Sequence, residues 1–407
     1  MVLLNITSEI GLLKTVVLKR PGKEVENIIP QNVERLLFDN IPYLHGIQKE
    51  HDIFATVLRD RGVEVLYLDE LIEETLSIKH VKESFISQFL HESKAPFDDN
   101  MIGQRINDYL LSLSVQELVK SLMFGIRKEE IMEEKKSHLH EYIEDAFPFY
   151  IPPQPNLYYM RDPAFVIGNG MTLHNMKDQN RQRESMFIQV ILKYHPLFSK
   201  QEISVWLDRD YPFSLEGGDI LILNKETIAI GISERTSAKA IEQLSVNLFK
   251  QRSGFKRIIA ITVPKSRTYM HLDTIFTMVD KNKFCIHPIV LTEKVYSLEM
   301  VIDSTEVKVA EEIDLETTLQ RVLNLDEIVF IHCGGDDKVA TSREQGDDAT
   351  NTLAISPGVV ITYDRNDITN HLLRQNGVEV LEIPSSELSR GGGGPRCMSM
   401  PLIREDL

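Results

Sequence analysis

Short stretches in which apolar and polar residues alternate recur along this chain, and each follows a segment with helical spacing. The clearest pair is nearly a repeat, because residues 57–66 read VLRDRGVEVL and residues 372–381 read LLRQNGVEVL. In both, an apolar helical face ends at a glycine, which is typical of a helix C-terminus, and an alternating strand follows. The same order recurs over 184–207, 238–263 and 315–332. The pattern therefore predicts five helix–strand units.

A unit repeated in this way favours a radial or stacked architecture, in which each unit buries its apolar face against its neighbours. Residues 71–146 interrupt the repeat, since they show helical spacing and little strand pattern. Ser114 and Glu117 have the spacing of a capping box that opens one of these helices. We expect an α/β domain of residues 1–70 and 147–407, with a helical domain of residues 71–146 inserted for packing and assembly. One inserted helix should bury a face made of Val81, Phe85, Ile86, Phe89 and Leu90.

Composition narrows the cellular setting. The 407 residues include 45 Lys and Arg against 61 Asp and Glu, a net charge of −16 that disfavours nucleic acid and anionic membranes and is compatible with a cationic substrate. The three cysteines, Cys285, Cys333 and Cys397, form no CxxC pair, which argues against a structural zinc site and for a reducing compartment. The sequence also shows neither a signal-peptide pattern nor a membrane-spanning apolar run. We therefore expect a cytoplasmic protein.

The C-terminal stretch Ser389 to Ser399 reads SRGGGGPRCMS and holds the strongest candidate nucleophile. Four consecutive glycines allow a backbone to approach a ligand closely. Cys397 follows Arg396 directly, and a neighbouring cation favours a lowered thiol pKa, whereas acidic groups that bind a cationic substrate would raise it in the empty site, so the sequence leaves the protonation state of Cys397 open. A flexible glycine-rich tail with an incidental cysteine explains the same residues equally well. This stretch alone leaves both interpretations open.

Three further polar clusters fall in loops or at strand ends: Arg-Asp-Pro at 161–163, Glu-Gly-Gly-Asp at 216–219 and His-Leu-Asp at 271–273. Taken singly, each has an ordinary explanation as a turn, an acidic hairpin loop or a surface histidine beside a capping aspartate. Together with Cys397 they supply a thiol, an imidazole and several carboxylates. A Cys-His pair serves nucleophilic catalysis, and the surplus of carboxylates suits a cationic substrate.

Longer motifs in a fixed order give a more specific indication. The sequence resembles the arginine deiminases, a family of the guanidino-group-modifying (pentein) superfamily, over nearly its whole length. The matching motifs are SEIG at 8–11, LLFD at 36–39, KEHD at 49–52, PNLY at 155–158, RDP at 161–163, EGGD at 216–219, SERT at 233–236, MHLDT at 270–274 and PRCMS at 395–399.

This resemblance implies a fold and a reaction. The fold is a five-bladed, pseudo-symmetric α/β propeller with an inserted helical bundle. The reaction is the hydrolysis of L-arginine to L-citrulline and ammonia through a covalent amidino-cysteine intermediate, without a metal or an organic cofactor. The resemblance further implies a homodimer or homotetramer.

The resemblance also assigns roles to residues of this chain. It implies that Cys397 is the nucleophile and that His271 and Glu216 transfer protons. Asp162 and Asp273 would bind the guanidinium group. The rest of the substrate would be held by Asn156, Arg181, Arg235, Asp219 and Gly391.

Several positions depart from the family pattern around the expected pocket. Gly392 stands where many members carry arginine, Gly346 replaces a tryptophan, Met160 replaces a threonine, and the stretch leading to Arg181 reads Lys-Asp at 177–178. Two alternatives stay open: an enzyme for another guanidine, such as agmatine or a methylated arginine, or an impaired paralogue that binds arginine or a protein partner. Because every proposed catalytic group is present, we expect an active arginine deiminase.

Overall fold

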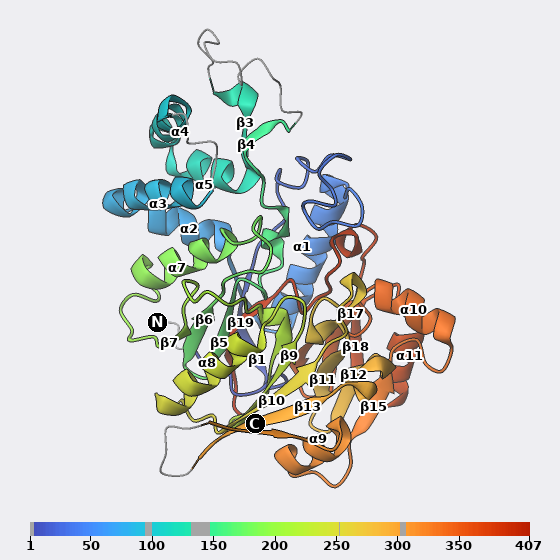
Figure 1. The fold of residues 1–407 in the computed structure, drawn as a ribbon. Coiled ribbons are helices and arrows are strands. Elements are labelled where there is room, and N and C mark those ends of the chain that lie inside the picture. The colour runs from blue at the N-terminus through green and yellow to red at the C-terminus, as the bar shows by residue number, and fades with distance from the viewer. Residues whose placement is uncertain (1–3, 94–99, 132–146, 252, 302–306) are drawn as a thin grey trace.

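The computed structural model describes residues 4–93, 100–131, 147–251, 253–301 and 307–407 (Figure 1). Within these ranges, five sheets of three or more strands share one building plan. Two antiparallel strands are followed by a helix, and a third strand then pairs in parallel with the second of the two. The chain thus has a mixed α/β fold.

Four of these units are continuous along the chain. The first two are β5 (Ala164–Ile167), β6 (Gly170–Leu173), α7 (Glu184–Tyr194) and β7 (Val205–Leu207), then β8 (Ile220–Asn224), β9 (Thr227–Ile232), α8 (Ala238–Lys250) and β10 (Arg257–Thr262). The other two are β11 (Phe276–Asp280), β12 (Lys283–Ile286), α9 (Leu315–Leu323) and β15 (Val329–His332), then β16 (Leu353–Ser356), β17 (Val359–Tyr363), α11 (Asp367–Gln375) and β18 (Glu379–Ile383).

The fifth unit joins the two ends of the chain. β19 (Met400–Arg404) pairs antiparallel with β1 (Leu13–Leu18). After α1 (Leu44–Asp60), β2 (Glu64–Tyr67) pairs in parallel with β1. The last strand therefore takes the first place in a unit that the N-terminal segment completes. All five expected helix–strand pairs are present, and the prediction of five units is confirmed.

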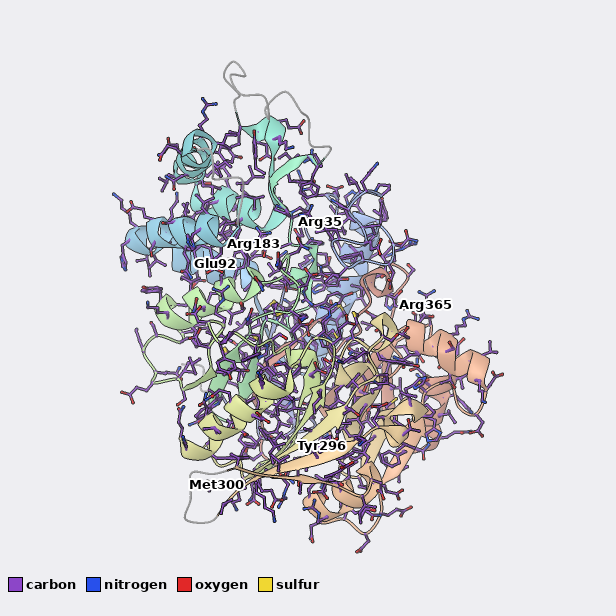
Figure 2. All side chains as sticks on the ribbon, viewed as in Figure 1. Arg35, Glu92, Arg183, Tyr296, Met300 and Arg365 are labelled. Atoms are coloured by element: carbon purple, nitrogen blue, oxygen red, sulfur yellow. The ribbon has the colours of Figure 1, made fainter. Side chains whose placement is uncertain are left out.

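One sheet is extended beyond this plan. β10 runs parallel to β9 in unbroken register from Arg257 opposite Thr227 to Thr262 opposite Ile232. The hairpin of β13 (Val295–Met300) and β14 (Val307–Glu311) then adds two antiparallel strands beside β10. In Figure 2, the labelled Met300 at the end of β13 lies near the lower left edge of the molecule, and Tyr296 of the same strand lies further in.

Helices between β2 and β4 form a separate group at the upper left of Figure 1. They are α2 (Leu68–Leu76), α3 (Lys79–Glu92), α4 (Asn100–Ser112) and α5 (Val115–Phe124), and the short strands β3 (Ile126–Arg127) and β4 (Phe149–Ile151) close the group. The capping box at Ser114 is confirmed, because its hydroxyl accepts from Glu117 N at 3.3 Å and Glu117 Oε2 accepts from Ser114 N at 3.1 Å. The predicted inner face of α3 is buried as expected. Residues 94–99 and 132–146 of the expected helical domain lie outside the described residues.

The helical group shares its apolar core with the neighbouring sheets. Phe187 of α7 is fully buried and packs on Phe85 and Phe89 of α3, with ring centroids 5.6 and 6.1 Å apart. At the same junction, the guanidinium of Arg183 lies over the Phe89 ring, 5.2 Å from its centroid, and Glu92 pairs with Arg209 (Figure 2). These contacts fix the helices against the first continuous unit.

The remaining helices and short turns connect the units. α10 (Lys338–Gly346) follows β15, and the short 3₁₀ turns include η2 (Pro155–Tyr158), η3 (Gly217–Asp219), η5 (Leu272–Thr274) and η7 (Leu388–Gly391). In the part of the chain that the structure describes, no helix has the length and apolar character needed to cross a membrane.

Replacing Phe187 tests this junction. Phe187→Ala should lower the free energy of unfolding by about 3–5 kcal/mol, because it removes buried apolar surface and leaves a cavity between α3 and α7. Denaturant titration followed by circular dichroism measures the change, with Phe187→Leu as the smaller control at about 1 kcal/mol. A cost for the alanine variant no larger than for the leucine variant would contradict the assignment.

Candidate active site

Polar residues gather in the segments that enter the first strand of each unit. They are Asp162 before β5, Glu216 and Asp219 before β8, His271 and Asp273 before β11, Asn351 before β16 and Cys397 before β19. Backbone hydrogen bonds tie several of these segments together, for example from Arg161 N to Cys397 O at 3.0 Å and from Gly217 N to Asp162 O at 3.2 Å. Five loops that are distant in sequence therefore converge on one buried site.

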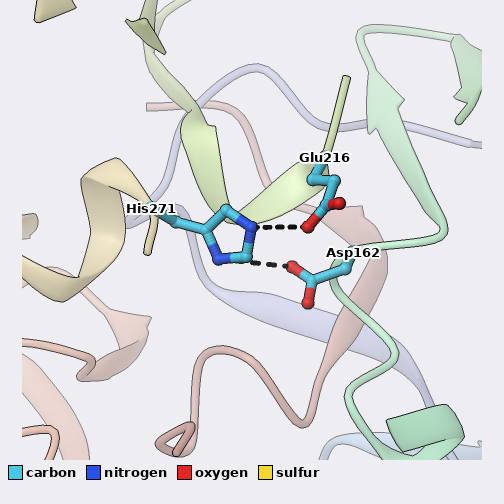
Figure 3. Close-up of side chains that lie close together, drawn as sticks. All are labelled: Asp162, Glu216 and His271. Atoms are coloured by element: carbon cyan, nitrogen blue, oxygen red, sulfur yellow. Dashed lines mark hydrogen bonds and ion pairs between the residues drawn. The ribbon is translucent and has the colours of Figure 1, made fainter. Parts of the chain in front are cut away.

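His271 lies between two carboxylates (Figure 3). Its Nε2 atom is 2.7 Å from Glu216 Oε2, and its Nδ1 atom is 4.0 Å from Asp162 Oδ1. Gly218 permits this approach, because a Cβ at that position would lie 2.7 Å from the imidazole ring. Burial favours the neutral ring, but Asp162 and Glu216 outweigh it and raise the pKa of His271 to about 9. The imidazolium form therefore persists through neutral pH and is lost only as the pH rises through about 9.

Glu216 is fully buried and stays ionised. Burial alone would raise the pKa of Glu216, but Arg235 and the bond to His271 lower it below its ordinary range. Its second oxygen accepts a hydrogen bond from Lys177 N at 3.0 Å. The guanidinium of Arg235 lies 3.6 Å from Glu216 Oε2. Glu216 can therefore hold the proton of His271 in place while keeping its own charge.

Asp162 has partners on both oxygens. Oδ1 accepts from Gly218 N at 3.1 Å, and Oδ2 accepts from Arg181 Nη1 at 2.9 Å. Arg181 is buried and also pairs with Glu184, with Nη2 at 2.9 Å from the carboxylate. The structure thus brings Arg181 to the site, but in contact with two carboxylates.

Cys397 lies beside Asp273 in the buried interior. Its Sγ atom is 3.6 Å from Asp273 Oδ2, and the sulfur also accepts from Asn351 Nδ2 at 3.1 Å. Asp273 Oδ1 is buried and has no hydrogen-bond partner among the described residues. An unpartnered buried carboxylate oxygen is unfavourable, so this atom is suited to accept an N–H group from a ligand.

The sequence left the protonation state of Cys397 open between a lowering by Arg396 and a rise caused by the acidic groups, and the structure favours the rise. Burial, and then the negative charges of Asp273 and Asp162, raise the pKa of this thiol well above its ordinary value. Arg396 directly precedes Cys397 in the chain. Its guanidinium, however, pairs with Glu9 at 3.2 Å and with Asp273 at 2.8 Å. Sequence adjacency suggested a cation at the sulfur, whereas the fold uses that cation to neutralise carboxylates.

Asn156 and Asp219, two other expected binding residues, have hydrogen-bond partners within the protein. Asn156 donates to Leu36 O at 2.7 Å, and Asp219 accepts from Ser233 Oγ at 2.6 Å. Burial raises the pKa of Asp219 to about 6. Asp219 also accepts a hydrogen bond from Leu272 N at 2.8 Å, so it supports the segment that carries His271.

Gly391 and Arg235 also lie near the site. A Cβ on Gly391 would lie 2.2 Å from the hydroxyl of Tyr158, so glycine is required for the chain to pass there. Arg235 points toward Met270, with Nη2 at 3.6 Å from its sulfur. Its Nη1 atom is buried without a hydrogen-bond partner among the described residues.

Sequence reasoning missed two residues of the site. Asn351 contacts Cys397 directly, and Asp348 adds a buried carboxylate whose backbone has a φ of 56°. Burial and the charge of Asp273 raise the pKa of Asp348 well above its ordinary range. The available signal was positional, because the loop before β16 is the fifth member of the set of loops that carry the other site residues.

Three of these side chains also have the spacing of a metal-binding group. Ligand atoms of Asp162, Glu216 and His271 lie within 4.8 Å of one another. These side chains already have hydrogen-bond partners within the protein, since Glu216 Oε2 contacts His271 Nε2 and Asp162 Oδ1 accepts from Gly218 N. A thiol, an imidazolium and paired carboxylates together suit nucleophilic attack on a cationic carbon.

Comparisons with solved structures show the fold. A mutant of the DDAH from Pseudomonas aeruginosa in complex with citrulline aligns over 96% of this chain and 99% of that chain, with a TM-score of 0.52 and 14% identity. The amidinotransferase SxtG from Microseira wollei aligns over 99% of this chain and 98% of that chain, with a TM-score of 0.53 and 13% identity. The chain therefore has the mixed α/β pentein fold of these proteins.

Sequence comparisons show the family. The arginine deiminase of Bacillus thuringiensis subsp. konkukian (strain 97-27) is 55% identical over 408 residues, which covers 99% of this chain and 99% of that protein. The arginine deiminase of Listeria monocytogenes serotype 4b (strain CLIP80459) is 51% identical over 99% of this chain and 98% of that protein. A family model described as arginine deiminase matches residues 34–404. The chain belongs to the arginine deiminase family.

Proposed function

We propose that this protein hydrolyses L-arginine to L-citrulline and ammonia through a covalent amidino-cysteine intermediate. The observation that carries the proposal is the unpartnered, buried Oδ1 of Asp273 beside the Cys397 sulfur, among the described residues. A guanidinium group satisfies this oxygen, since its planar N–H groups bind carboxylates in pairs. Asp162 supplies the second carboxylate. The two together hold the central carbon of the guanidinium close to Sγ.

Binding of the cation also prepares the nucleophile. The thiol is held neutral by burial and by the surrounding carboxylates, as its raised pKa indicates. A guanidinium between the carboxylates and the sulfur neutralises that negative field and favours loss of the thiol proton to solvent. The substrate therefore promotes formation of the thiolate that attacks it.

His271 then supplies and removes protons. Sγ attacks the guanidinium carbon and forms a tetrahedral intermediate, and the imidazolium of His271 donates its proton to the departing nitrogen, which leaves as ammonia. The neutral imidazole next removes a proton from water, and the hydroxide attacks the amidino carbon. The C–S bond then breaks as the new hydroxyl group passes its proton to the departing thiolate, which releases neutral citrulline and restores the thiol. Glu216 keeps the imidazole oriented through the 2.7 Å contact.

Arg235 is the best placed cation for the other end of the substrate. Its buried Nη1 atom has no hydrogen-bond partner within the described ranges, so it can receive a carboxylate oxygen. Arg181, Asn156 and Gly391 complete the proposed binding set. Arg181 contributes while it keeps the Glu184 and Asp162 charges paired.

The finer architecture is part of the same proposal. We take the five units to form a five-bladed propeller with residues 71–146 as an inserted helical domain. The five loops that precede the first strands meet in one site, and the β19–β1 pairing joins the chain ends. We further propose a cytoplasmic homodimer or homotetramer. Sedimentation of the purified protein measures its assembly.

Product analysis tests the reaction. The protein should release citrulline and ammonia in equal amounts from L-arginine, whereas Cys397→Ala should release neither, because no covalent intermediate can form. Chromatographic citrulline assay and enzymatic ammonia assay provide the measurement. Turnover of agmatine in preference to L-arginine would reject Arg235 and Arg181 as carboxylate-binding groups, and silence of the parent protein on both guanidines would reject the proposal.

The paired carboxylates can be tested one at a time. Asp162→Asn and Asp273→Asn should each lower kcat/KM for L-arginine about 30- to 5,000-fold, because each removes a buried charged partner of the guanidinium. Steady-state citrulline release measures the loss. Asp364→Asn, an exposed aspartate that accepts from Ser385 Oγ at 2.9 Å, is the control and should keep parental activity. Parental kcat/KM in either pocket variant would remove that residue from guanidinium binding.

The protonation state of His271 provides an independent test. In the parent protein its ring should stay charged until the pH rises through about 9. Glu216→Gln removes one of the two carboxylates that hold the charge, so the imidazolium should be lost at a lower pH. NMR titration of ¹⁵N-histidine-labelled protein, with His271→Asn for assignment, measures the midpoint.

The matched control is Glu344→Gln. Glu344 is also buried but accepts from Ile368 N and Thr369 N at 2.9 Å, at the start of α11. This variant should leave the His271 midpoint at its parental value. An unchanged midpoint in Glu216→Gln would show that Glu216 does not hold the proton of His271.

A further inference from the structure

The amide side chain of Asn351 forms two hydrogen bonds with Cys397. Cys397 N donates to Asn351 Oδ1 at 3.0 Å, and Asn351 Nδ2 lies 3.1 Å from Cys397 Sγ. A backbone N–H can only donate, so the amide oxygen must face it. The amide N–H₂ group is therefore left facing the sulfur and can only donate to it. Such a donor favours the thiolate over the thiol.

Asn351 is itself rigidly placed. It is fully buried, and its backbone N donates to Asp348 O at 2.9 Å across a tight turn. The preceding residue, Thr350, is also held in place, because the hydroxyl of Thr277 in β11 donates to Thr350 O at 2.6 Å. The chain on the other side approaches closely at Gly394, where a Cβ would lie 2.7 Å from Asn351 O. The loop that carries Asn351 therefore connects Cys397 to β11, the strand that follows His271 and Asp273.

The charges around Sγ leave a specific need for such a donor. Asp273, Asp162 and Asp348 oppose the thiolate, and Arg396 favours it less strongly than the carboxylates oppose it. The guanidinium of Arg396 donates hydrogen bonds to Glu9, Asp273 and the Ile220 carbonyl, and not to the sulfur. Among the described residues, the N–H donor at hydrogen-bond distance from the sulfur is Asn351 Nδ2.

We propose that Asn351 is a positioning residue for the nucleophile, whose amide fixes the orientation of Cys397 and stabilises its thiolate by an N–H···S hydrogen bond. This inference rests on the proposed function, in which Cys397 attacks the guanidinium carbon. It assigns a task to the loop before β16 that parallels the tasks of the other four loops.

Thiol alkylation tests the inference without depending on turnover. The rate of iodoacetamide reaction at Cys397 is measured against pH by peptide mass spectrometry in the parent protein and in Asn351→Ala. The reactive thiolate should appear about one to two pH units higher in the variant, because a hydrogen bond to a charged group has been lost. With L-arginine, kcat should fall about 10- to 100-fold while KM stays within about threefold of the parental value.

Asn351→Asp keeps the shape of the side chain and the acceptor for Cys397 N. It removes the N–H donor and, once ionised, adds a like charge beside the sulfur. Its alkylation midpoint should therefore move up at least as far as in Asn351→Ala. This near-isosteric variant decides the question if the alanine variant does not fold, as judged by circular dichroism.

Asn370→Ala is the matched control. Asn370 is also buried, and its amide donates to Tyr363 O at 2.9 Å without contacting the thiol. It should lower thermal stability and leave both the alkylation midpoint and kcat at parental values. If a folded Asn351 variant behaves like this control, Asn351 is merely structural and the inference fails. If the alkylation midpoint shifts in the Asn351 variants while the parent protein itself releases no citrulline, the inference about Asn351 is upheld and the deiminase function is rejected.

Discussion

The crowding of carboxylates around one buried thiol dominates the physical chemistry of this protein. Negative charges in a low-dielectric interior oppose each other and oppose a thiolate, so burial raises the pKa of Cys397 instead of activating it. The fold compensates part of this charge with Arg396 and Arg181, each bound to two acidic side chains. Among the described residues, Oδ1 of Asp273 remains without a hydrogen-bond partner. In the proposed function a guanidinium binds there and weakens the negative field that opposes the thiolate.

The repeated ββαβ unit explains how such a site can be built. Every unit presents the residues before its first strand to the same place, so each loop needs to contribute only one or two groups. Asp162, Glu216, His271 and Cys397 therefore come from four different loops and still lie within contact of one another or of common neighbours. The pairing of β19 with β1 brings the C-terminal Cys397 into this set. Packing of Phe187 against α3 anchors the helical group without involving it in the chemistry.

Hydrogen bonds divide the site into two halves. In one half Glu216 stays charged and holds His271 protonated at neutral pH. In the other half Asn351 forms two hydrogen bonds with Cys397, and Asp273 leaves one oxygen unpartnered among the described residues. Glycines at 218 and 391 let these halves approach, because side chains there would overlap His271 and Tyr158. Substrate bound between the halves would contact both.

The sequence by itself determined the repeat of helix and strand, because apolar periodicity and glycine termini are local properties that each segment carries with it. It also determined the order of the family motifs, and hence the identity of the thiol, imidazole and carboxylates that meet. Only the tertiary structure decided the state of those groups. Arg396 neighbours Cys397 in sequence, yet its guanidinium points to Glu9 and Asp273, and burial together with the charges of Asp273 and Asp162 raises the thiol pKa. Asn351 likewise has no chemical signature of its own, since its contact with Cys397 arises only when distant loops pack together.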